Sequence, residues 1–125
     1  IEAQTMIDMA RRQILPAVES YAAKLAETLA TKKALSPLLS GKYETGLLTK
    51  LSGLTDDIAE AADALDASLA AYHKIDDVTE AACFIRDEVL PKMDALRAPA
   101  DEAERFTAAE YWPFPTYGDL LFGVK

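Results

Sequence analysis

Apolar side chains recur every three or four positions over three long stretches of this chain, and that period predicts an all-helical protein. We expect helices over residues 1–35, 43–74 and 77–110. A loop separates the first two because Ser36 precedes Pro37, and a residue before proline is pushed out of the α region. Helices of about 30 residues are about 45 Å long, which predicts an elongated antiparallel three-helix bundle.

Each expected helix carries one apolar stripe, and the three stripes together define the expected core. The stripe of the first helix consists of Ile7, Ile14, Val18, Tyr21, Leu25 and Leu29. The stripe of the second helix consists of Tyr43, Leu47, Leu51, Leu54, Ile58, Ala62, Leu65, Leu69 and Tyr72. The stripe of the third helix consists of Val78, Ala82, Ile85, Val89, Met93, Leu96, Ala103 and Phe106. Gly46 and Gly53 each weaken the second helix by roughly 1 kcal/mol, so it is expected to start late or to break near Gly53.

Prolines predict bends in the first and third helices. Pro91 and Pro99 fall within the third, where the missing N–H and the ring distort an α-helix. The apolar stripe keeps its phase through both, which favours one bent helix over two helices meeting at Pro99. Residues 14–19 (ILPAVE) resemble residues 89–94 (VLPKMD), so we hypothesise that bends at Pro16 and Pro91 lie level and let the two helices curve together around the second. Chance similarity between helical segments explains this likeness at least as well.

Polar residues mark the turn between the second and third helices. His73 is the only histidine and falls near the end of the second helix, where an imidazole interacts favourably with the helix dipole. Asp77 is expected to cap the third helix, with Glu80 reaching back to it in an acidic variant of the capping box. These residues therefore predict helix ends and not a catalytic site.

The last 15 residues differ in kind from the helical bundle, which we take as residues 1–110. Residues 111–125 contain Pro113 and Pro115, which force an extended path, and half of all aromatic residues in the chain. An exposed tail would not carry so much apolar surface, so this segment is expected to dock. Two surfaces are open to it: another domain, or one end of its own bundle. The candidate docking residues are Tyr111, Trp112, Phe114, Tyr117 and Phe122.

Charge and composition exclude several classes of function. The chain of 125 residues has 21 acidic and 13 basic side chains and a net charge of −8, so it lacks the basic surface that binds nucleic acid. No stretch reaches the roughly 18 apolar residues needed to cross a membrane. Cys83 is the only cysteine and forms no internal disulfide, which indicates either a reducing compartment or a protein indifferent to redox conditions. Residues 1–9 begin with isoleucine and have the pattern of a helix interior, so we expect further chain upstream.

No catalytic, cofactor-binding or metal-ligating residue is predicted. A di-metal site in a helical bundle needs a glutamate three residues before histidine, and Ala70 stands there. Nothing orients Cys83 and His73 as a thiolate pair, and Cys83 lies between Ala82 and Phe84 like a small core residue. The acidic residues of the second helix lie opposite its apolar stripe, as a solvated face does. The sequence also lacks a glycine-rich phosphate-binding loop.

Three segments of the chain resemble the end of type III glutamine synthetases. They are residues 6–17 (MIDMARRQILPA), residues 86–93 (RDEVLPKM) followed by the acidic residues 100–104, and residues 111–122 (YWPFPTYGDLLF), the most distinctive of the three. The resemblance implies an enzyme that ligates ammonia to glutamate with ATP and divalent magnesium or manganese. It also implies a large cytoplasmic homo-oligomer of stacked hexameric rings.

The resemblance places the nucleotide, metal and glutamate residues of that family upstream of Ile1, so none is carried over and the chain alone is expected to bind no ATP. It implies a non-catalytic C-terminal domain that packs on its own catalytic domain and on other subunits and supports oligomer assembly. The alternative is a free-standing helical adaptor or dimerisation module that binds a partner helix in a groove. That alternative requires an apolar surface beyond the core stripe along a whole helix, and the sequence places such an excess mainly in residues 111–125.

Overall fold

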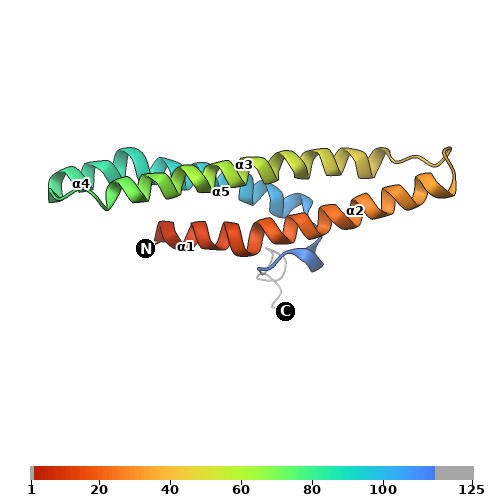
Figure 1. Cartoon of the computed structure of the whole chain (residues 1–125), viewed down its shortest axis with the longest axis horizontal. Coiled ribbons are helices and arrows are strands. Elements are labelled where there is room, and N and C mark those ends of the chain that lie inside the picture. The colour runs from red at the N-terminus through yellow and green to blue at the C-terminus, as the bar shows by residue number, and fades with distance from the viewer. Residues whose placement is uncertain (1, 115–125) are drawn as a thin grey trace.

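The computed structural model describes residues 2–114, and these form helices and connecting turns without a β-strand. The prediction of an all-helical protein is confirmed. The first long segment consists of α1 (Glu2–Met9), η1 (Ala10–Ile14) and α2 (Leu15–Leu35), and the second is α3 (Lys42–Tyr72). The third consists of α4 (Val78–Phe84), η2 (Ile85–Val89) and α5 (Leu90–Phe106), and the short η3 (Ala109–Tyr111) follows. The chain reverses direction after α2 and again after α3, which gives the elongated shape in Figure 1.

Local chemistry explains where these segments begin and end. Ser36 is extended, with φ −160° and ψ 131°, as expected for a residue before proline. Asp77 caps α4 by accepting a hydrogen bond from the backbone N–H of Glu80 at 2.8 Å. The third segment ends at Phe106, earlier than the expected residue 110, because Thr107 already has an extended backbone. No helix within residues 2–114 is both long and apolar enough to cross a membrane.

The core is a single apolar cluster centred on α3, which packs against both α2 and α5. The second predicted stripe is buried wherever three helices meet, and its fully buried members are Leu51, Ile58, Ala62 and Leu65. Tyr43, the first residue of that stripe, is 70% exposed because α5 ends before it can cover the start of α3. The stripe period therefore locates the core, and the ends of the shorter helices limit its length.

Each outer segment contains one π-helical turn, which ends two residues before a proline. In η1, the N–H of Leu15 donates to the carbonyl of Ala10, five residues earlier, and an equivalent bond closes η2. Pro16 and Pro91 lack an N–H and crowd the carbonyl four residues before them, and a wider turn relieves that crowding. The two similar hexapeptides thus share a backbone feature. Bends at these prolines stay a prediction.

The π turn of η2 overturns part of the predicted third stripe. A π turn contains about one residue more than an α turn, and one residue corresponds to roughly 100° of rotation. The residues before η2 are therefore rotated relative to the expected phase. Val78 is 83% exposed and Ala82 is exposed, whereas both were expected inside, and Phe84 packs against the core in their place.

The two π turns lie at different levels along the molecule. Ile85 of η2 lines a hollow together with Ala3, near the start of the first segment. Ile14 of η1 lines another hollow, together with Ala100 of α5. Bends at the two prolines would therefore not lie side by side, and the hypothesis of level, matched bends is wrong. Among the described residues, α4 extends past the start of α1, and the α2–α3 turn extends past α5 (Figure 1).

We expect Gly53→Ala to raise the free energy of unfolding by roughly 0.5 to 1 kcal/mol. The helix α3 is unbroken at Gly53, and an added Cβ would meet no atom within 4 Å. The change therefore removes only the extra freedom of glycine in the unfolded chain. Gly41→Ala is the matched control, because its Cβ would collide with the Cδ1 of Leu29. Urea denaturation measures both, and a lower midpoint for Gly53→Ala would contradict the prediction.

Candidate functional site

The start of the predicted docking segment lies against the helices of its own chain. The ring centroid of Tyr111 lies 5.2 Å from that of Tyr21 on α2, with the rings tilted by 42°. Trp112 and Phe114 meet edge to face at 6.2 Å, and both pack against the core cluster. These three aromatic residues are half-buried, so each keeps part of its surface exposed for a further contact.

Tyr117 and Phe122, the other two candidate docking residues, lie outside the described residues.

One short helical turn brings these aromatic residues to α2. After α5 ends, η3 closes with hydrogen bonds from the N–H of Tyr111 to the carbonyl of Ala108 at 2.9 Å and from that of Trp112 to Ala109 at 3.1 Å. This turn directs the chain across the side of α2 (Figure 1). Burial raises the pKa of the Tyr21 hydroxyl, and the neighbouring Tyr43 and Tyr111 raise it further. The hydroxyl therefore stays neutral at ordinary pH and acts as a hydrogen-bonding group.

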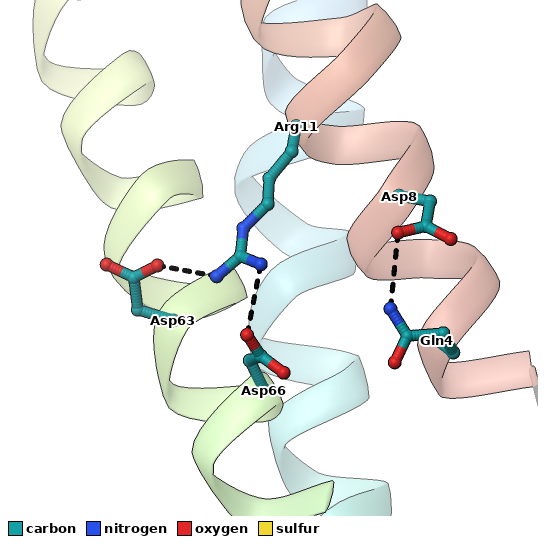
Figure 2. Close-up of polar contacts among 5 residues, drawn as sticks. All are labelled: Gln4, Asp8, Arg11, Asp63 and Asp66. Carbon is teal, nitrogen blue, oxygen red and sulfur yellow. Dashed lines mark hydrogen bonds and ion pairs between the residues drawn. The ribbon is translucent and has the colours of Figure 1, made fainter. Parts of the chain in front are cut away.

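A forked ion pair joins the first and second segments. Figure 2 shows Arg11 of η1 reaching two carboxylates of α3, Asp63 at 2.8 Å and Asp66 at 3.0 Å. The hydrogen bonds that Arg11 donates to these carboxylates raise the pKa of the guanidinium above its already high ordinary value. The pair is exposed, so its contribution to stability is small. The pair joins η1 to α3. On the outer side, Gln4 donates to Asp8 at 3.2 Å.

A second ion pair lies near the α2–α3 turn and is partly buried. The Nζ of Lys32 lies 2.6 Å from an Oε of Glu44, whose side chain is only 8% exposed. The hydrogen bond from Lys32 lowers the pKa of the Glu44 carboxyl below its ordinary value. The other oxygen of Glu44 is buried without a hydrogen-bond partner. Glu44 is therefore a charged group held inside the helical hairpin by one lysine.

The two residues considered for catalysis lie on either side of the turn between α3 and α4. His73 follows α3 directly and donates its backbone N–H to the carbonyl of Leu69 at 3.0 Å, at the predicted helix end. Cys83 is exposed, and the expectation of a small core residue is wrong, because the π turn of η2 rotates α4. Within residues 2–114, no group of three or more histidine, cysteine or acidic side chains is placed to hold a metal ion.

Comparison with known proteins identifies similar sequences. Residues 1–33 match the family described as the glutamine synthetase C-terminal domain. A glutamine synthetase of Butyrivibrio fibrisolvens is 30% identical over 125 residues, which is 100% of this chain and 18% of the relative. The type-3 glutamine synthetase of Dictyostelium discoideum is 22% identical over 98% of this chain and 17% of its own length. A glutamine synthetase of Bacteroides fragilis is 29% identical over the same shares.

The chain thus spans less than a fifth of the length of these curated relatives. The resemblance to the C-terminal part of type III glutamine synthetases is confirmed by these matches.

Proposed function

We propose that this chain is the non-catalytic C-terminal domain of a type III glutamine synthetase. In this proposal it forms an antiparallel three-helix bundle that packs on the catalytic domain of a longer cytoplasmic protein and supports assembly of the oligomer. The observation that carries the proposal is the similarity of the whole chain to less than a fifth of each relative, together with the match of residues 1–33 to the C-terminal domain. The longer protein would ligate ammonia to glutamate with ATP and divalent magnesium or manganese.

The polar contacts of the described residues support a structural role. The neighbouring carboxylates of Asp63 and Asp66 both form ion pairs with Arg11. Glu44 is held by Lys32 inside the hairpin. Side chains engaged in this way join helices to one another. We therefore assign the ATP, metal and glutamate sites of the longer protein to its catalytic domain.

The aromatic segment is our candidate for the contact with the rest of the enzyme. Tyr111, Trp112 and Phe114 are half-buried against their own bundle, so the described part of the segment is already ordered before it meets a partner. Preordered aromatic side chains contribute strongly at interfaces because little freedom is lost on binding. In the proposal their remaining surface, with Tyr117 and Phe122, contacts the catalytic domain or a neighbouring subunit.

We expect the double change Trp112→Ala, Phe114→Ala to shift the longer protein toward smaller assemblies, at least tenfold in dissociation constant, because half-buried aromatic side chains are typical interface anchors. Sedimentation velocity measures the assembly, and circular dichroism confirms that the helices persist. Tyr72→Ala removes a half-buried aromatic side chain at the far end of α3 and is the control. Unchanged assembly of the double variant would show that the segment only covers its own bundle.

A further inference from the structure

The turn between α2 and α3 exposes an unusual number of large apolar side chains. Leu35 is 80% exposed, Leu38 is 93% exposed, and Leu39 and Tyr43 are exposed as well. The turn is the tip of a two-helix hairpin, because α5 ends before it (Figure 1). Single exposed leucines are ordinary, whereas two exposed leucines on a protruding turn, with an exposed apolar side chain at the end of each adjoining helix, indicate a contact surface.

The backbone of this turn is held in place by its own polar groups. The Nζ of Lys33 donates to the carbonyl of Leu39 at 2.8 Å. The hydroxyl of Ser36 accepts a hydrogen bond from the N–H of Leu38 at 3.2 Å. The hydroxyl of Ser40 accepts one from the N–H of Lys42, the first residue of α3, at 3.3 Å. Because Gly41 has no Cβ, the backbone of the turn can approach the side chain of Leu29 on α2 closely. The exposed leucines are thus presented on a fixed loop, which lowers the entropy cost of docking.

The two ends of the molecule carry opposite charge. Residues 28–50 contain four lysines and one glutamate, and that glutamate is buried. Residues 56–88 contain ten acidic side chains against two lysine or arginine side chains. These two ranges lie toward opposite ends of the elongated molecule (Figure 1). The charge is therefore distributed along the long axis, from basic at the α2–α3 turn to acidic near α4.

The acidic end contains an apolar hollow. Six residues around α4 and η2 line it, with a volume of about 360 Å³: Ile75, Glu80, Cys83, Phe84, Asp87 and Glu88. Phe84 and Ile75 supply its apolar surface. Of the three carboxylates, Asp87 is paired with Arg86 at 2.9 Å and Glu88 with Lys92 at 3.0 Å. A leucine-rich turn is complementary to this apolar surface, and the acidic excess of residues 56–88 favours the basic end of a second molecule there. Within one chain the two cannot meet, because the 31 residues of α3 separate them by about 46 Å.

We propose that the α2–α3 turn of one copy of this chain docks into the acid-lined hollow at the α4 end of a second copy. Leu38 and Leu39 contact the apolar surface of the hollow, and Lys33 and Lys42 lie near its carboxylates. This names the surface for the assembly role, so it rests on the proposed function. The contact is head-to-tail, so it leaves one copy with a free hollow and the other with a free turn, and the assembly either closes into a ring or grows as an open chain.

Two variants of the whole chain test this contact by mixing. Leu38→Ser, Leu39→Ser removes the apolar turn but keeps the hollow, and Phe84→Ser removes the floor of the hollow but keeps the turn. Each variant alone is expected to dissociate about 100-fold more readily than the unchanged chain, because burial of a leucine contributes strongly. Mixed together, they retain one intact turn and one intact hollow and are expected to form a one-to-one complex. Sedimentation velocity measures all three samples, and circular dichroism confirms that Phe84→Ser is still helical.

Charge variants give an independent readout that does not depend on the core. We expect Lys42→Glu to weaken association about tenfold and Glu88→Lys in the second copy to restore it, with the wild-type contact weakening as salt is raised. Lys24→Glu, an exposed lysine on the side of α2, is the control and is expected to change nothing.

Three results would overturn the proposal: an unchanged chain that stays monomeric at millimolar concentration, mixed variants that do not associate, or a turn that binds anionic vesicles and not a second copy. These readouts involve the turn and the hollow, whereas the proposed function is tested at Trp112 and Phe114. A bundle that needs its aromatic segment for assembly but not its turn would therefore refute this inference alone.

Discussion

Leu65→Ala is expected to lower the free energy of unfolding by about 3 kcal/mol and the melting temperature by about 10 °C. Leu65 is fully buried in α3, and α3 packs against both outer segments of the bundle. The change removes most of a buried side chain and leaves a cavity. The side chains of the two neighbouring segments are held by their own packing, so they fill this cavity only in part. Urea denaturation followed by circular dichroism measures the loss.

The control for this prediction is the same substitution at an exposed site. Leu35 ends α2 and is 80% exposed, so Leu35→Ala removes the same atoms from water and not from a core. Its effect on unfolding is expected to stay within about 0.5 kcal/mol. Equal losses at Leu35 and Leu65 would mean that α3 does not occupy the centre of the bundle.

Lys32→Ala is the second change with a large expected effect, and it destabilises the chain more than Glu44→Gln does. Removing Lys32 leaves the Glu44 carboxylate inside the hairpin without its cation, with one oxygen already lacking a partner. Removing the charge of Glu44 leaves Lys32, which is 41% exposed and can turn to water. The order of the two midpoints in urea tests this asymmetry. A larger loss for Glu44→Gln would contradict it.

The same pair predicts a dependence of stability on pH. The pKa of Glu44 is lowered below its ordinary value of 4.5 by the hydrogen bond from Lys32. The folded state therefore binds a proton less readily than the unfolded state, and the pair stabilises the fold above the unfolded pKa. That stabilisation is lost as the pH falls from 4.5 through the lowered pKa of the folded state. In Lys32→Ala the loss on acidification is expected to be smaller, which denaturation at a series of pH values measures.

Most of the core was predictable from period, and the exceptions have identifiable causes. At the start of α3, Leu47 lies four residues after Tyr43 and three after Glu44, so either residue fits a helical stripe. Side-chain chemistry favoured Tyr43 for the inside. The structure buries Glu44, because Lys32 on the facing helix neutralises it, and no local sequence signal pairs two residues so far apart.

The π turns limited the prediction in a different way. The third stripe keeps its spacing in the sequence across Ile85 and Val89. The π turn of η2 nevertheless contains about one extra residue, and this rotates the side chains of α4 relative to those of α5. The exposure of Val78 and Cys83 is the result. A proline predicts a disturbance of the helix. Whether the helix responds by bending or by a wider turn depends on packing around it, which the sequence does not display.

The docking segment was predictable as far as its composition reaches. Clustered aromatic residues beside prolines indicated that the segment would dock, and its three described aromatic residues, Tyr111, Trp112 and Phe114, are half-buried. Their first contact, Tyr111 on Tyr21, could not be predicted, because it depends on α5 ending at Phe106 and on the direction that η3 gives the chain. The apolar turn at Leu38 was missed for the opposite reason, since short loops carry no periodic pattern.

Because the helices are offset along the long axis, α3 turns a small rotation at one end of the molecule into a displacement at the other end. The helix α3 is 31 residues long, about 46 Å, and its first turns project beyond the end of α5. A rotation of about 5° around the α4 end moves the α2–α3 turn by about 4 Å, roughly three quarters of the pitch of one helical turn. Small changes of angle at one end of this domain therefore become displacements at the other end that are large enough to make or break a contact.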